Sequence, residues 1–95
     1  MRDYELMYIL HPRLDEEGIM SHIERVTRWI TAAGGEVLET TPWGRRRLAY
    51  PIQKQIEGFY VLQRFRIPPN AVSALDRNLR LNEEIMRHLI VRPGA

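Results

Sequence analysis

The stretch Phe59-Tyr60-Val61-Leu62-Gln63-Arg64-Phe65-Arg66-Ile67 predicts the most regular β-strand of this 95-residue chain. Apolar side chains recur at a period of two and form one face, made of Phe59, Val61, Phe65 and Ile67. The other face is mixed and carries Tyr60, Leu62, Arg64 and Arg66. Pro68 and Pro69 end the strand, because proline has no backbone N–H to donate to a neighbouring strand. We therefore expect a strand over residues 59–67 with one buried face.

The chain before this strand starts with a second period-two pattern and then changes to a helical one. Over residues 2–10 the apolar face consists of Tyr4, Leu6, Tyr8 and Leu10, and Pro12 follows. Asp15 with two glutamates after it is typical of a helix start, where a side chain caps free N–H groups. Apolar residues then recur at spacings of four and three, namely Ile19, Ile23, Val26, Ile30 and Ala33. Gly34-Gly35 predicts the end of this helix.

Residues 36–53 predict a longer strand with Pro42 and Gly44 near its middle. A proline inside a strand is found at a sheet edge or a bulge, so we place this strand at an edge of the sheet. Residues 54–58 are expected to form the turn to the next strand.

The C-terminal part repeats the order of helix and strand. Asn70 is expected to cap a second helix, whose apolar stripe is Val72, Leu75 and Leu79. Residues 86–92 predict a last strand that Pro93 ends. Its inward-facing side chains are expected to be Met86, His88 and Ile90.

The order strand-helix-strand, repeated once, predicts an α+β fold. Two right-handed units of this kind interleave into a ferredoxin-like two-layer sandwich, β-α-β-β-α-β, with a four-stranded antiparallel sheet and two helices on one face. We expect residues 1–95 to form a single domain. The other face of the sheet would then be open, with Met7, Ile9, Tyr60 and Leu62 on it. Such an apolar face is expected to be covered by another molecule. The alternative is an open face that stays loosely solvated, which small sandwiches tolerate.

Basic residues are concentrated in the middle of the chain. Fourteen basic and twelve acidic residues give a net charge of only +2, but residues 40–66 carry +5 and residues 1–39 carry −4. Thirteen of the fourteen basic residues are arginine, whose planar guanidinium can bind a phosphate through two hydrogen bonds. This distribution indicates an anion-binding site, and an arginine-rich composition without a specific role is the alternative.

Several classes of function are not expected from this sequence. The chain has no cysteine, and its three histidines are not at metal-ligand spacing, so no metal site is expected. Neither an activated serine nor a glycine-rich phosphate loop is present, so we expect no catalytic residue and no cofactor. Acidic residues interrupt the N-terminal apolar stretch, and no apolar run reaches the roughly 18 residues of a membrane span. We therefore expect neither a signal peptide nor a membrane partner.

The segment from Thr41 to Ile52 combines arginines with aromatic residues. Arg45 and Arg47 are expected on one side of the strand and Arg46 on the other, because side chains alternate. Trp43 and Tyr50 offer flat surfaces on which a nucleobase could stack. Arginines, aromatic rings and a bent edge strand together favour RNA binding. The alternative is a solvated edge strand whose charges prevent edge-to-edge aggregation.

The run Gly44-Arg45-Arg46-Arg47-Leu48-Ala49-Tyr50-Pro51-Ile52 closely resembles the signature of the bacterial small-subunit ribosomal protein S6 family. The resemblance covers nearly the whole chain. It includes Arg2-Asp3-Tyr4-Glu5, His11-Pro12, Gly34-Gly35-Glu36-Val37 and Gly58-Phe59-Tyr60, in that order. Gln53 departs from the basic or small residue that often follows the isoleucine in this family.

This resemblance implies a structural, non-catalytic component of the small ribosomal subunit in the bacterial cytoplasm. It implies binding to small-subunit ribosomal RNA together with ribosomal protein S18. We expect the chain to be a monomer when free. The RNA-facing residues implied by the resemblance are Arg2, Arg45, Arg46, Arg47, Tyr50 and Lys54, with Arg87 and Arg92 on the last strand. The residues expected to contact the protein partner are Met7, Tyr60 and Leu62.

Two alternatives remain open from the sequence. One is a free-standing RNA-recognition module, since Gly58-Phe59-Tyr60-Val61 partly matches the central-strand motif of such modules. The other is a ferredoxin-like regulatory or ligand-binding domain that dimerises through its open sheet face.

Overall fold

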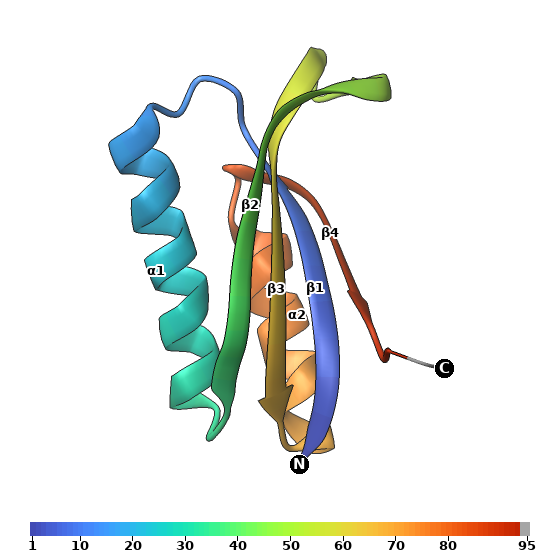
Figure 1. Ribbon diagram of the computed structural model, residues 1–95. Helices are drawn as coiled ribbons and strands as arrows, with labels where there is room; N and C mark the ends of the chain where they lie inside the picture. The colour runs from blue at the N-terminus through green and yellow to red at the C-terminus, as the bar shows by residue number, and fades with distance from the viewer. Residues whose placement is uncertain (94–95) are drawn as a thin grey trace.

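The computed structural model describes residues 1–93, so the last two residues of the predicted 1–95 domain lie outside the described residues. Figure 1 shows one sheet, with α1 beside it and α2 behind it. In chain order the elements are β1 (Arg2–Leu10), α1 (Glu16–Ala32), β2 (Glu36–Ile52), β3 (Gln55–Ile67), a short 3-10 helix (Pro69–Ala71), α2 (Val72–Leu81) and β4 (Ile85–Val91).

The four strands lie in the order β2-β3-β1-β4, and every neighbouring pair is antiparallel. This is the predicted ferredoxin-like α+β arrangement, and it confirms that the proline-containing strand β2 lies at an edge. The first helix begins as expected, because the Asp15 side chain accepts a 2.8 Å hydrogen bond from the backbone N–H of Gly18. It ends as expected too, with Gly34 in the left-handed region at a φ of 87°.

The main hydrophobic core lies between the helices and the inner face of the sheet. Tyr4 and Phe65 stack in this core with their ring centroids 5.6 Å apart. All of the predicted inward-facing residues of β1 are buried, as are four of the five stripe residues of α1 and two of the stripe of α2, Leu75 and Leu79. Ala33, the last residue of the predicted α1 stripe, follows the helix and is half-buried, as is Phe59. The period-two and helical patterns therefore identified most of the core.

A polar network crosses this apolar core. The Tyr8 hydroxyl donates a 2.7 Å hydrogen bond to Oε1 of Gln63, and both side chains are fully buried. The amide nitrogen of Gln63 donates to the hydroxyls of Thr27 on α1 and Thr40 on β2, each at 3.1 Å. The network therefore joins three strands and one helix and satisfies polar groups that would otherwise be costly to bury.

The hairpin of β2 and β3 bends away from α1 at its upper end, toward the side of β4 (Figure 1). The pairing shifts register between Pro42 and Gly44, and Gly44 has a φ of 91°, a conformation that other residues adopt only with strain. The bend brings Leu48 against Ile9 and Met86, which form a second, smaller buried cluster. The chain's own hairpin therefore covers part of the sheet face that the sequence predicted to be open.

The close approach of these residues depends on Gly58 of β3. A Cβ atom at this position would lie 2.3 Å from Cγ2 of Ile9 and 3.0 Å from Cε of Met86. Only a glycine therefore leaves room for the second cluster in this arrangement.

Three local predictions were wrong. Asn70 does not cap α2, because it lies within the 3-10 helix and no side chain caps α2 in the described structure. The turn between β2 and β3 is not residues 54–58 but the pair Gln53 and Lys54, which have φ values of 51° and 65° as in the tightest hairpins. Met86 does not face inward with His88, because a β-bulge between Ile9 and Leu10 turns it to the opposite face.

Candidate RNA-binding surface

The eight predicted RNA-facing residues fall into two groups. Six lie on the bent part of the hairpin or beside it, namely Arg45, Arg46, Arg47, Tyr50, Lys54 and Arg87. Arg2 and Arg92 lie toward the other end of the sheet, where Figure 1 places the N-terminus. The fold therefore gathers six of the predicted residues at the bent hairpin and leaves two of them away from it.

Arg45 points toward the helix side of the hairpin and holds the loop between β1 and α1. Its guanidinium donates to the carbonyl oxygens of Pro12, at 2.7 Å, and Leu14, at 3.1 Å. Glu57 on β3 lies 4.0 Å from the same group. Arg45 thus has a structural contact that the sequence pattern did not reveal.

Arg46 and Arg87 each lie over an aromatic ring. The guanidinium carbon of Arg46 is 5.9 Å from the centroid of the Trp43 ring, and that of Arg87 is 5.4 Å from the centroid of the Tyr50 ring. Arg87 also donates a hydrogen bond to the Tyr50 hydroxyl. Because Arg87 is on β4 and Tyr50 on β2, this contact joins the two edge strands across the bend.

Most cations of the bent hairpin have no acidic partner. Within residues 1–93, no carboxylate forms an ion pair with Arg46, Arg47, Lys54 or Arg87. The arginines farther along the sheet are different, because Arg64 pairs with Glu39 and Arg66 with Asp3 and Glu36. The local excess of positive charge therefore lies at the hairpin and not over the whole sheet face.

Beyond the hairpin, the outer sheet face has an apolar part beside the ion pairs of Arg64 and Arg66. A hollow there is lined by Glu5, Met7, Trp43, Leu62, Leu89 and Val91. Leu89 has 62% of its surface exposed and Trp43 has 43%. Two of the three predicted partner-contacting residues, Met7 and Leu62, line this hollow. Tyr60 lies beside the hollow and packs against the second cluster. The sequence did not single out Leu89 and Val91, which extend the patch onto β4.

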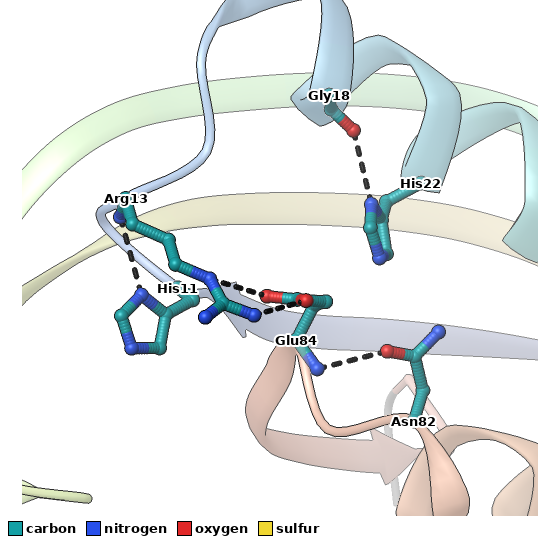
Figure 2. Close-up of polar contacts among 6 residues, drawn as sticks. All are labelled: His11, Arg13, Gly18, His22, Asn82 and Glu84. Atoms are coloured by element: carbon teal, nitrogen blue, oxygen red, sulfur yellow. Dashed lines mark hydrogen bonds and ion pairs between the residues drawn. The ribbon is translucent and has the colours of Figure 1, made fainter.

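A polar cluster fastens the loop after β1 to the start of β4 (Figure 2). Arg13 forms an ion pair with Glu84, whose Oε2 accepts from Nε at 3.2 Å, and this pairing lowers the pKa of Glu84. The backbone N–H of His11 donates to the Glu84 carbonyl at 2.8 Å. His22 is buried on α1 with its Nδ1 at 3.0 Å from the Gly18 carbonyl, and its ring points toward Glu84 in the figure. The contacts of His11 and Arg13 with Glu84 therefore hold the same loop that Arg45 contacts at Pro12 and Leu14.

In residues 1–93, no group of three or more His, Asp or Glu side chains is placed to hold a metal ion. None of the helices in that range has the length and apolar character required to cross a membrane.

The sequence model of the family described as ribosomal protein S6 matches residues 3–92. The chain belongs to the ribosomal protein S6 family. Membership places it in the small ribosomal subunit and so in the bacterial cytoplasm, as the sequence resemblance implied. Neither of the two alternative functions is favoured by these comparisons.

Relatives and a solved structure agree with the S6 assignment over almost the full chain. The small ribosomal subunit protein bS6 of Desulforamulus reducens is 44% identical over 99% of this chain and 99% of its own length. That of Carboxydothermus hydrogenoformans is 46% identical over 97% of this chain and 96% of its own. The crystal structure of 30S ribosomal protein S6 from Thermotoga maritima superimposes with a TM-score of 0.91 at 33% identity, over 96% of this chain and 86% of that one.

Proposed function

We propose that this S6 family member binds small-subunit ribosomal RNA through the bent β2–β3 hairpin, acts together with ribosomal protein S18 and has no catalytic activity. The observation that carries the proposal is the set of exposed cations at the hairpin that have no acidic partner within residues 1–93. Unpaired cations can neutralise phosphates without first breaking an ion pair, and release of counterions from the RNA then favours binding. The proposed contact residues are Arg45, Arg46, Arg47, Tyr50, Lys54 and Arg87, with Arg2 and Arg92 as outlying members.

Most of these contacts are expected to position the protein on the RNA and not to read bases. Arginine and lysine side chains on an exposed ribbon reach the phosphate backbone more readily than base edges in a folded RNA. The two outlying arginines lie toward the opposite end of the sheet, so they would contact a different RNA segment from the hairpin.

The apolar hollow on the outer sheet face is the proposed contact for S18. Met7, Tyr60 and Leu62 belong to it or border it, and the carboxylate of Glu5 lies in its lining. A small basic protein would cover the apolar surface and meet this acid at its edge. The net charge of +2 predicts weak RNA binding by this chain alone, so the basic partner should raise the affinity.

Sedimentation of a cell lysate tests the proposed place of the protein. The tagged chain is expected to travel with small subunits in a sucrose gradient, and a variant with Arg45, Arg46 and Arg47 all changed to Ala is expected to remain at the top. If the variant is folded and still travels with small subunits at the wild-type level, the three arginines do not bind the RNA.

Filter binding tests the paired-binding part of the proposal. Affinity of the chain for small-subunit RNA is expected to rise when S18 is added, and equal affinity with and without S18 would contradict it. Sedimentation equilibrium of the isolated chain is expected to show a monomer. A stable dimer at low concentration would instead support the regulatory-domain alternative.

A further inference from the structure

We propose that Trp43 and Tyr50 are platforms that hold Arg46 and Arg87 ready to bind phosphate, and that neither ring stacks on a nucleobase. This inference rests on the proposed RNA-binding function and assigns roles within it. The sequence suggested the opposite use of the two rings, as surfaces for bases. The structure shows that a guanidinium of the same chain already lies over each ring.

The first pair is local to the bend in β2. Gly44 sets the turn of the backbone between Trp43 and Arg46, and the guanidinium lies 5.9 Å from the ring centroid. A guanidinium over an aromatic face keeps its N–H donors at its edge, where they remain free to bind an anion. Trp43 therefore occupies one face of Arg46 without using its hydrogen-bonding capacity.

The second pair joins two elements that are far apart in sequence. Arg87 is opposite Ile9 in the β1–β4 register, whereas Tyr50 is near the end of β2. The bend of the hairpin brings them into contact, with the guanidinium 5.4 Å from the ring centroid and one N–H donated to the hydroxyl. Since a guanidinium has five N–H donors, most of them remain available for phosphate.

The two pairs differ from the other arginines of the same sheet in their partners. Arg64 and Arg66 are held by carboxylates, so an anion would have to displace an acid to bind them. Arg46 and Arg87 are held by uncharged rings, which restrict the side chains and leave the positive charge uncompensated. Restricting a side chain before binding lowers the entropy lost on binding, so each ring should raise the affinity of its arginine for RNA.

A double-mutant cycle on each pair tests the platform role, with filter binding of purified small-subunit RNA in the presence and absence of S18. Arg46→Ala is expected to weaken binding roughly tenfold and to lower the salt dependence by about one unit of slope. Trp43→Leu should weaken RNA binding about two- to fivefold, which is the contribution of an exposed cation–π contact. Trp43→Phe keeps an aromatic ring and should therefore retain most of the wild-type affinity. The double variant should bind no worse than Arg46→Ala alone.

Tyr50→Leu and Arg87→Ala form an independent cycle, because Tyr50 does not line the apolar hollow that includes Trp43. Arg80→Ala is the matched control, since Arg80 is exposed on α2 and pairs with Asp76 at 3.2 Å. Circular dichroism and thermal melting show whether each variant is folded.

The outcomes separate the platform role from the proposed function. If Arg46→Ala and Arg87→Ala leave RNA binding unchanged, the proposed RNA-binding residues are wrong and the platform role falls with them. If the arginine variants weaken binding but the ring variants do not, only the platform role is overturned. If each ring variant adds its full effect to that of its arginine variant, the ring contacts RNA or partner by itself, and that too overturns the platform role.

Discussion

The hydroxyl of Tyr8 on β1 donates a 2.7 Å hydrogen bond to the side-chain oxygen of Gln63 on β3, and neither side chain is accessible to solvent. Gln63 has the same orientation as Val61 and Phe65, so the amide lies in the middle of the apolar inner face. Thr27 and Thr40 accept hydrogen bonds from its nitrogen and complete the network. The core of this small domain therefore depends on one buried polar network as well as on apolar packing.

Replacing Tyr8 by Phe is expected to lower the free energy of unfolding by about 1–3 kcal/mol, because Oε1 of Gln63 would stay buried without a donor. Urea unfolding followed by circular dichroism measures the change. Tyr4→Phe is the matched control, since Tyr4 is buried in the same core but its hydroxyl forms no side-chain hydrogen bond with other residues in 1–93. An equal loss in both variants would contradict the role of the network.

Tyr8 also predicts how stability changes in alkali. Burial raises the pKa of the Tyr8 hydroxyl above its ordinary value of 10.0. Because the folded-state pKa is the higher one, the unfolded state loses its proton first, and the unfolding free energy falls as the pH rises above about 10. Wild type should lose stability between pH 10 and 12 more steeply than Tyr8→Phe. If the stabilities of the two proteins depend on pH in the same way, the Tyr8 hydroxyl ionises as readily in the folded state as in the unfolded state, which would contradict the prediction.

The pair of Asp76 and His88 predicts the behaviour in acid. A 2.7 Å contact with Nε2 of His88 lowers the pKa of Asp76 below its ordinary value of 3.8, and Arg80 contributes to the same shift. Because the pKa of Asp76 is lower in the folded state than in the unfolded state, its ionised carboxylate stabilises the fold above pH 3.8. This stabilisation is lost as the pH falls through the folded-state pKa. Asp76→Asn should cost about 0.5–1 kcal/mol at pH 6 and little at pH 2, measured by thermal melting. A constant difference between the two proteins at both pH values would exclude this carboxylate as the cause.

Arg45 predicts a stability effect that its neighbours lack. Loss of the hydrogen bonds to Pro12 and Leu14 in Arg45→Ala should lower the unfolding free energy by about 1–2 kcal/mol. Arg46→Ala and Arg47→Ala should change it by less than about 0.5 kcal/mol, since both side chains are exposed and have no acidic partner in residues 1–93. Urea unfolding of the three single variants provides the comparison. Equal stabilities would mean that Arg45 does not hold the loop in solution.

The layers and strand order could be predicted from the sequence because they depend on periodicity. The apolar faces of β1, β3 and α1 repeat at their own period, and Pro42 in β2 limits that strand to an edge. The details that could not be predicted depend on contacts between distant segments. The bulge beside Ile9 reverses Met86, and Gly58 leaves the space into which both side chains pack. No local pattern contains that information.

The candidate surface also has features that the sequence predicted and features that it did not. The cluster of arginines was visible as a run of charge in residues 45–47. The contact of Arg87 with Tyr50 was not, since only the bend of the hairpin brings β2 to β4. The contact of Arg45 with the loop could not be predicted from the sequence either, because Pro12 is 33 residues away in the chain.

The salt dependence of RNA affinity shows whether the unpaired cations of the bent hairpin bind ribosomal RNA. Binding to small-subunit RNA is measured with S18 present over a range of KCl concentrations, for wild type and for a variant with Arg46, Arg47 and Arg87 all changed to Ala. If these cations bind the RNA, the variant binds more weakly, and its slope of log affinity against log salt is smaller by about two to three. The same affinity and the same slope in a folded variant would contradict their binding to the RNA.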